Sequence, residues 1–155
     1  MSRETFRLLL LVTLLGVVST WAYNYSQKME RRDKAEEFVR KYIRLVQAND
    51  LQMAYLNYTA ERFRKIMPFE KFNQSYGLAF RKMGDLKSYK VLAWLEPGVG
   101  RDYYQIDFDA QYARDTGKMR FVMDLENGQY KLSGFLVYGD HWEKLPETYD
   151  TDNPR

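Results

Sequence analysis

The side chains best suited to acid–base chemistry in this chain are two aspartates two positions apart. Asp107 and Asp109 stand in a run that alternates apolar and polar residues, and a carboxylate held in an apolar setting can act as a general base. The alternation points both away from the apolar side chains of their run. Lys118 or Arg120 in the next run could pair with them. We therefore expect exposed ion pairs here rather than a catalytic site.

The only histidine, His141, lies beside Asp140 near the end of the sequence. A zinc site needs three or four ligands, and the chain has no cysteine to supply them. Gly98-Val99-Gly100 lacks the further glycine and the helix that a phosphate-binding loop requires. The sequence therefore predicts an exposed His141, no metal, no cofactor and no enzymatic activity.

Aromatic residues make up 16% of the chain, beside 7 methionines, and such side chains suit an adaptable apolar pocket. The same positions could form a plain hydrophobic core, with the hydroxyl of Tyr42 reaching water or a backbone carbonyl. Both readings stay open. The candidates for a pocket are Phe38, Tyr42, Phe108, Tyr112, Met119 and Phe121.

A second group of apolar residues occupies strand positions whose side chains should, by alternation, point to the outer, polar face of the sheet. A contiguous apolar patch on such a face usually marks an interface. The residues near Trp142 could also cover it. We expect this patch to bind another protein or a second copy of the chain, and its members are Trp94, Leu92, Val122, Phe135 and Val137.

The first half of the chain has helical periodicity. Residues 28–49 carry apolar side chains at spacings of three and four, Asn49 suits a left-handed helix end, and Asp50 can cap the next helix, 51–58. A short piece, 61–66, precedes a further helix from Pro68 to Met83, which Gly84 ends. Three helical units are therefore expected.

After Asp85 the period changes to two, which predicts antiparallel strands. Asn127-Gly128 is a strong signal for a hairpin turn, because both residues tolerate positive φ. Helices followed by strands indicate an α+β domain, in which the helices pack on a sheet of about four strands over residues 88–95, 103–112, 118–125 and 130–138.

This order of elements resembles the nuclear transport factor 2-like (cystatin-like) superfamily, and in particular its small exported bacterial members of unknown function. The residues that carry the resemblance are Asn49-Asp50-Leu51, Ala54-Tyr55, Phe69, Phe72 and the closing run from Gly128 to Phe135, with Tyr130 where those members often have Trp. The resemblance covers roughly residues 33–138. It implies a curved sheet wrapped round a long helix as a cone, often with an apolar pocket, and frequent dimers. It selects no single activity, because the superfamily holds isomerases, dehydratases, binding modules and periplasmic domains of secretion channels.

A charge-free run from Leu8 to Tyr23 precedes this domain. At about 1.5 Å per residue it would cross most of a hydrocarbon core roughly 30 Å thick. It predicts either a retained anchor, with Trp21, Tyr23 and Tyr25 at the membrane interface, or a signal peptide cleaved after Ala22. We expect an inner-membrane protein with its domain on the periplasmic side.

Charge is divided unevenly, with 15 Lys/Arg and 8 Asp/Glu in residues 24–90 but 7 and 12 in residues 91–155. The basic half could lie on anionic lipid or be an ordinary solvated surface. Nucleic acid is not an expected partner, because acidic residues interrupt the basic ones. The domains are then an anchor or signal (1–24), one α+β domain (25–139) and an acidic tail (140–155).

These features predict a membrane-anchored, non-enzymatic interaction module. We expect an accessory or assembly subunit of a membrane protein complex, with the lipid bilayer and that complex, or a second copy, as its partners. The alternative is a small apolar ligand-binding or isomerase-type domain that uses the interior of the cone.

Overall fold

The computed structural model describes residues 3–141, except for the side chains of residues 3–10, 76–78, 80 and 81. The chain forms two compact parts, divided between Glu37 and Phe38 within helix α1 (Arg3–Gln47). The predicted acidic tail lies outside the described residues, apart from Asp140 and His141.

The first part is helical, and its apolar side chains are exposed. From Leu11 to Val18 every large apolar side chain is more than half exposed. The rings of Trp21 and Tyr25, one helical turn apart, stack with their centroids 5.5 Å from each other. In the part of the chain that the structure describes, no helix has both the length and the apolar character needed to cross a membrane.

The second part begins with the last turns of α1, which carry one apolar stripe. Val39, Tyr42, Ile43 and Val46 are buried, at the spacings of three and four that pack one helix face. The helix predicted from Lys28 is thus the end of a longer one. As the sequence predicts, the chain leaves α1 through a left-handed residue, Asn49 (φ 59°).

Helix α2 (Leu51–Tyr58) starts at the predicted cap. The backbone N–H of Met53 donates to Oδ1 of Asp50 at 3.2 Å, which satisfies one of the free donors of the first turn. Leu51, Ala54 and Tyr55 are buried, as expected.

Two further helices precede the sheet. The short piece forms a helix of its own, α3 (Glu61–Ile66), and is followed by α4 (Phe69–Met83). Gly84 ends α4 with φ 75°, a conformation that glycine adopts at no steric cost. The described chain therefore has α1 to α4 where three helical units were expected.

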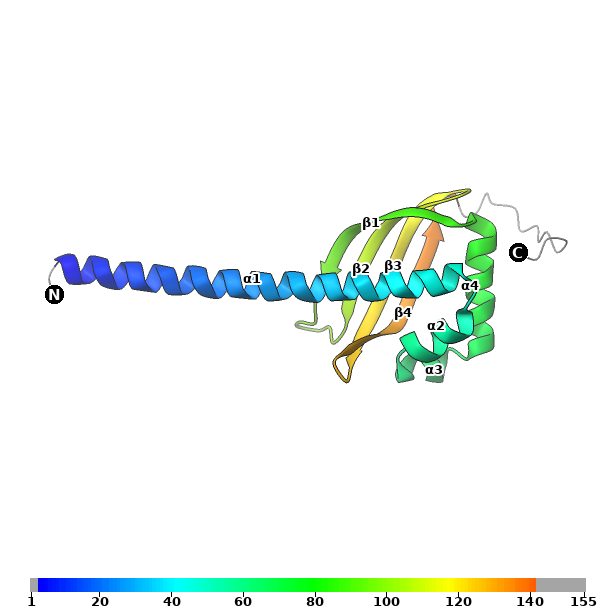
Figure 1. Ribbon diagram of the computed structural model, residues 1–155, viewed down its shortest axis with the longest axis horizontal. Helices are drawn as coiled ribbons and strands as arrows, with labels where there is room; N and C mark the ends of the chain where they lie inside the picture. Colours follow the sequence, from blue (N-terminus) through cyan, green and yellow to red (C-terminus); the bar gives the residue numbers. More distant parts are fainter. Residues whose placement is uncertain (1–2, 142–155) are drawn as a thin grey trace. The chain divides into compact units, whose positions relative to one another are not determined.

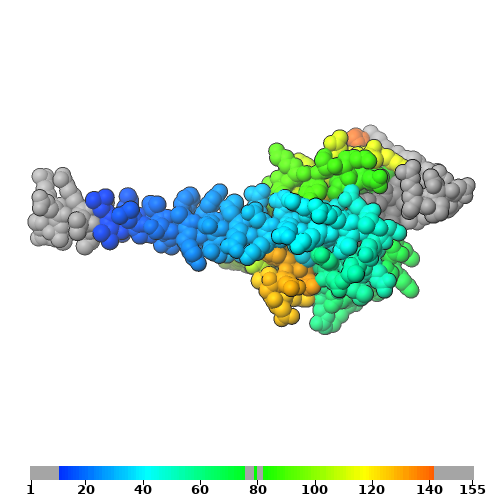
Figure 2. Space-filling model, viewed as in Figure 1, coloured from blue at the N-terminus to red at the C-terminus, as the bar shows by residue number. Residues whose placement is uncertain are grey.

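The sheet confirms the α+β class. Its antiparallel strands are β1 (Leu86–Leu95), β2 (Tyr104–Tyr112), β3 (Thr116–Glu126) and β4 (Gln129–Gly139), in the order β1-β2-β3-β4. The last turns of α1 cross one face of this sheet, and α2, α3 and α4 gather beside β4 (Figure 1). Asn127 and Gly128 both have positive φ, as the hairpin required, and their turn projects from the surface (Figure 2).

Three irregularities in strand pairing decide which side chains face the helices. In β1, Lys87 and Leu92 have no partner in β2, and in β4 Ser133 has none in β3. Each such bulge adds one residue and so reverses the alternation beyond it.

The predicted outer placement of three residues is wrong for this reason. Beyond Ser133, Phe135 lies opposite Phe121 and Val137 opposite Met119, all on the helix-covered face. Beyond Leu92, Trp94 lies opposite the buried Ile106. Of the predicted patch, only Val122 keeps an outward register position, and Leu92 is 48% exposed at its bulge.

Candidate functional site

The predicted pocket residues lie in the interior of the domain. The ring of Phe121 contacts those of Tyr42 and Phe108, with centroids 6.0 and 5.9 Å apart. Phe38 is half-buried and its ring lies 6.4 Å from that of Tyr130. Rings at these separations pack against one another. The remaining candidates, Tyr112 and Met119, are also buried.

Tyr112 is the one member of this set with an unsatisfied polar atom. Its hydroxyl is buried and has no hydrogen-bond partner among the described residues. Burial raises the pKa of this phenol above its ordinary value. Tyr112 is therefore protonated at neutral pH and supplies no phenolate base.

The predicted ion pair is confirmed for one of the two aspartates. Nε and Nη2 of Arg120 donate to the carboxylate of Asp107 at 2.9 and 3.0 Å, and the amide of Gln105 donates to the same group. Asp109 is exposed, opposite Lys118 in the register. Asp107 is thus held by a guanidinium on the outer face of the sheet.

His141 is exposed, as expected, but its imidazole contacts a buried acid. Nδ1 lies 2.9 Å from Oδ1 of Asp115, whose side chain is 1% exposed. Within residues 3–141, no three His, Cys, Asp or Glu side chains come together in a way that could hold a metal ion.

A groove of about 410 Å³ lies instead beside the edge strand β4. Helix α3 and the residue after it line the groove with aromatic, aliphatic and thioether side chains. Helix α4 adds small residues, and β4 adds both small and apolar ones. The residues that line the groove are Phe63, Ile66, Met67, Ser75, Ala79 and residues 133–137.

One side chain of the groove is notable for its exposure: Ile66, the last residue of α3, is 75% exposed. Leu136 of β4 is 50% exposed, but it lies opposite Arg120 in the register and its side chain is on the outer face of the sheet. Ile66 and the half-buried Met67 beside it give the groove an apolar surface that a partner can cover.

The edge of β4 forms one wall of the groove. Only a single bridge covers this edge among the described residues: Thr59 pairs with Leu132, and Ala60 N–H donates to Leu132 O at 2.7 Å. From Ser133 onward no described strand pairs with this edge of β4, the one that faces away from β3. Such an edge can pair with another chain.

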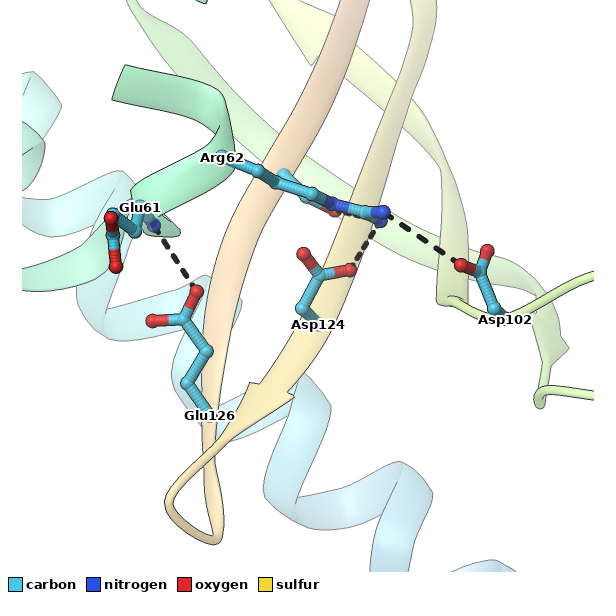
Figure 3. A network of polar contacts seen from close by, with 6 residues as sticks. Glu61, Arg62, Asp102, Asp124 and Glu126 are labelled. Atoms are coloured by element: carbon cyan, nitrogen blue, oxygen red, sulfur yellow. Dashed lines mark hydrogen bonds and ion pairs between the residues drawn. The ribbon is translucent and has the colours of Figure 1, made fainter. Parts of the chain in front are cut away.

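A polar network fixes α3 beside the sheet (Figure 3). The guanidinium of Arg62 contacts Asp124 of β3, lies 3.9 Å from Asp102, and donates to Ser133 Oγ at 3.4 Å. The backbone N–H of Glu61 donates to Glu126 at 3.1 Å. These contacts hold the first turn of α3 against β3 and β4, and so fix one wall of the groove.

No family model and no curated protein matches the chain. The resemblance to the nuclear transport factor 2-like superfamily therefore stays a prediction, and the function must be inferred from the geometry of the described residues.

The interface predicted from the sequence included Phe135 and Val137, but it included neither Ile66 nor Met67, and the groove itself was not predicted. Gly134 could have indicated the bulge at Ser133, because a glycine inside a strand often marks a bulge. No local signal brings Ile66 to β4, since the groove joins segments about 70 residues apart in the chain.

Proposed function

We propose that the chain is a membrane-anchored, non-enzymatic interaction module that binds another protein at the groove beside β4. It would serve as an accessory or assembly subunit of a membrane protein complex. The observation that carries this proposal is the open apolar groove next to a strand edge that no described strand covers. Such a surface is suited to a partner chain.

The membrane anchor in this proposal rests on the run from Leu8 to Tyr23. Its described apolar side chains are exposed on the helix, from Leu11 to Val18, and lipid would cover them. Trp21 and Tyr25 stack at its end, where aromatic side chains favour the membrane interface. We place the domain on the periplasmic side of an inner membrane. Cleavage after Ala22 would release it there.

A second candidate function is the binding of a small apolar molecule. The volume of about 410 Å³ is within the range of small-molecule pockets, roughly 300–1,000 Å³. This ligand would occupy the groove and not the interior, where the ring of Phe121 packs against those of Tyr42 and Phe108.

Photo-crosslinking in intact membranes tests the proposed function. A benzophenone amino acid replaces Ile66 in the groove or, as a matched control, Leu56, which is 56% exposed on α2 and does not line the groove. We expect a defined protein adduct from position 66 and none from position 56. Met67→Asp, made together with the crosslinker at position 66, should lower the yield of this adduct, because Met67 lines the groove.

The same experiment separates the alternatives. An adduct with twice the mass of the chain indicates self-association, and an adduct with lipid or another small molecule indicates the second function. Equal yields from positions 56 and 66 would contradict a specific groove.

A further inference from the structure

The backbone of β4 directs hydrogen-bonding groups into the groove. Asp140 N–H donates to Thr116 O at 2.7 Å, and alternate residues of an antiparallel strand face the same neighbour. Counting back from Asp140, the N–H and C=O of Val137 therefore point away from β3, toward the open edge. No backbone partner meets them among the described residues.

One segment of the chain already pairs with this edge of β4 in the manner of a strand. Thr59 pairs in parallel with Leu132, and Ala60 N–H donates to its carbonyl. The chain then turns into α3 at Glu61, so this pairing stops after one bridge. The groove continues along the same edge from Ser133 to Val137.

The last described residues of the chain donate hydrogen bonds away from this edge. Asp140 N–H donates to Thr116 O, and His141 N–H donates to Asp115 Oδ2 at 3.1 Å. Thr116 begins β3 and Asp115 precedes it, on the side of β4 opposite the groove. We take a segment from another molecule as the occupant.

The walls of the groove indicate the chemistry of that segment. Ile66, Met67 and Ala79 give it an apolar lining, which suits every second side chain of an extended peptide. Residues 61–83, which form α3 and α4, hold six Lys/Arg and two Asp/Glu. Arg62 is paired with Asp124 of β3 and Lys65 with Glu61, and the excess of positive charge that remains favours acidic residues beside the apolar ones.

We infer that the groove binds an extended, apolar segment of a partner protein with acidic flanks, added to the sheet as a strand beside β4. This inference rests on the proposed function and specifies how the partner is held. Main-chain hydrogen bonds to Val137 would supply affinity, and the apolar walls would select the side chains.

The test uses the full chain in a mild detergent and a phage-displayed library of random dodecapeptides as the probe. Peptides with alternate apolar residues and acidic flanks should be enriched. Their affinity is then compared for Val137→Pro, which removes the outward N–H, and Val137→Ala, which keeps it. Proline is tolerated at an edge where its missing N–H would face outward, and circular dichroism checks the fold of both variants.

We expect Val137→Pro to bind the selected peptides about tenfold more weakly than Val137→Ala, as the loss of one main-chain hydrogen bond implies. The amide of Val137 should exchange rapidly in the free protein and become protected with peptide. Equal affinities of the two variants would overturn strand addition. If Ile66→Asp abolishes peptide binding in that case, the groove as an interaction site stands and only its mode is wrong.

Protection of the Val137 amide in the free chain would also overturn the inference. Protection that is lost on dilution indicates a second copy, and protection that is lost when residues 142–155 are removed indicates the chain's own segment. Absence of any selected peptide overturns strand addition as well, while the crosslink from position 66 tests the proposed function independently.

Discussion

Nδ1 of His141 lies 2.9 Å from Oδ1 of Asp115, where the end of β4 meets the turn between β2 and β3. The backbone N–H groups of Thr116 and His141 donate to the same carboxylate at 2.9 and 3.1 Å. Burial raises the pKa of Asp115, but the hydrogen bonds from His141 and Thr116 outweigh it, and the pKa lies below its ordinary value. The ionised carboxylate therefore holds the end of β4 in place.

Acid should weaken this contact. A carboxyl whose folded pKa lies below its unfolded value stabilises the fold above the unfolded value, and the contribution is lost as the pH falls through the folded pKa. Asp115→Asn should therefore lower the urea midpoint at neutral pH, and its difference from wild type should shrink below the ordinary aspartate pKa of 3.8. Asp109→Asn, on an exposed strand position, is the control. A deficit of Asp115→Asn that persists unchanged in acid would contradict this account.

The bulge at Ser133 makes a prediction about the next two residues of β4. The ring of Phe135 lies 6.4 and 6.3 Å from those of Phe63 and Phe72, whereas Leu136 is 50% exposed. Phe135→Ala should cost about 2–4 kcal/mol of unfolding free energy because it leaves a cavity among rings. Leu136→Ala should cost less than about 1 kcal/mol. Urea denaturation measures both, and the opposite ranking would mean that β4 alternates without a bulge.

The features that could be predicted from the sequence depend on residues close together in the chain. The left-handed Asn49, the cap by Asp50 and the turn at Asn127-Gly128 each need only a few neighbouring residues. The change of period near Asp85 likewise separates the helices from the strands. Local chemistry and backbone sterics decide these features.

The same local reasoning could not predict which side chains of β1 and β4 point to which face of the sheet. Strict alternation assumes that every residue has a partner, and Leu92 and Ser133 have none. One extra residue exchanges the two faces of the strand beyond it. Trp94 and Phe135 therefore lie on the helix-covered face and not in the expected outer patch. The groove depends on this change, because Phe135 contacts Phe63 of α3.

Trp94 should now behave as a packing residue. Its ring stacks on Tyr104 at 5.6 Å and meets Tyr130 edge-on at 6.4 Å. Trp94→Asp would place a charge among these rings, and we expect a loss of about 3 kcal/mol or more, or failure to fold. Leu92→Asp, at the exposed bulge, should cost less than about 1 kcal/mol. Near-ultraviolet circular dichroism and urea denaturation distinguish these outcomes. A stable, folded Trp94→Asp variant would indicate that the side chain of Trp94 lies on the outer face of the sheet.

The pair formed by Asp107 and Arg120 should contribute little to stability. The two side chains are 20% and 49% exposed, and solvent screens such pairs. A double-mutant cycle with Asp107→Asn and Arg120→Gln should give a coupling energy of about 0.2–1 kcal/mol. If Asp107→Asn leaves stability unchanged but abolishes the cellular role of the protein, the carboxylate has a chemical function that its ion pair does not explain.

The proposed membrane anchor leads to a prediction about the exposed apolar residues of α1. Leu11 and Leu15 lie one helical turn apart and are 57% and 63% exposed. A lysine near the centre of a membrane helix costs about 2.5–3.5 kcal/mol in insertion experiments, so Leu11→Lys with Leu15→Lys should release the protein from membranes during an alkaline carbonate wash. Gln27→Lys, beyond the apolar run, should leave the protein in the membrane fraction, as wild type.

A cleaved signal peptide would also release the wild-type protein, so sequencing of its N-terminus separates the two cases. Met1 at the N-terminus indicates a retained anchor. Tyr23 indicates cleavage after Ala22 and a domain that reaches its partner without a tether.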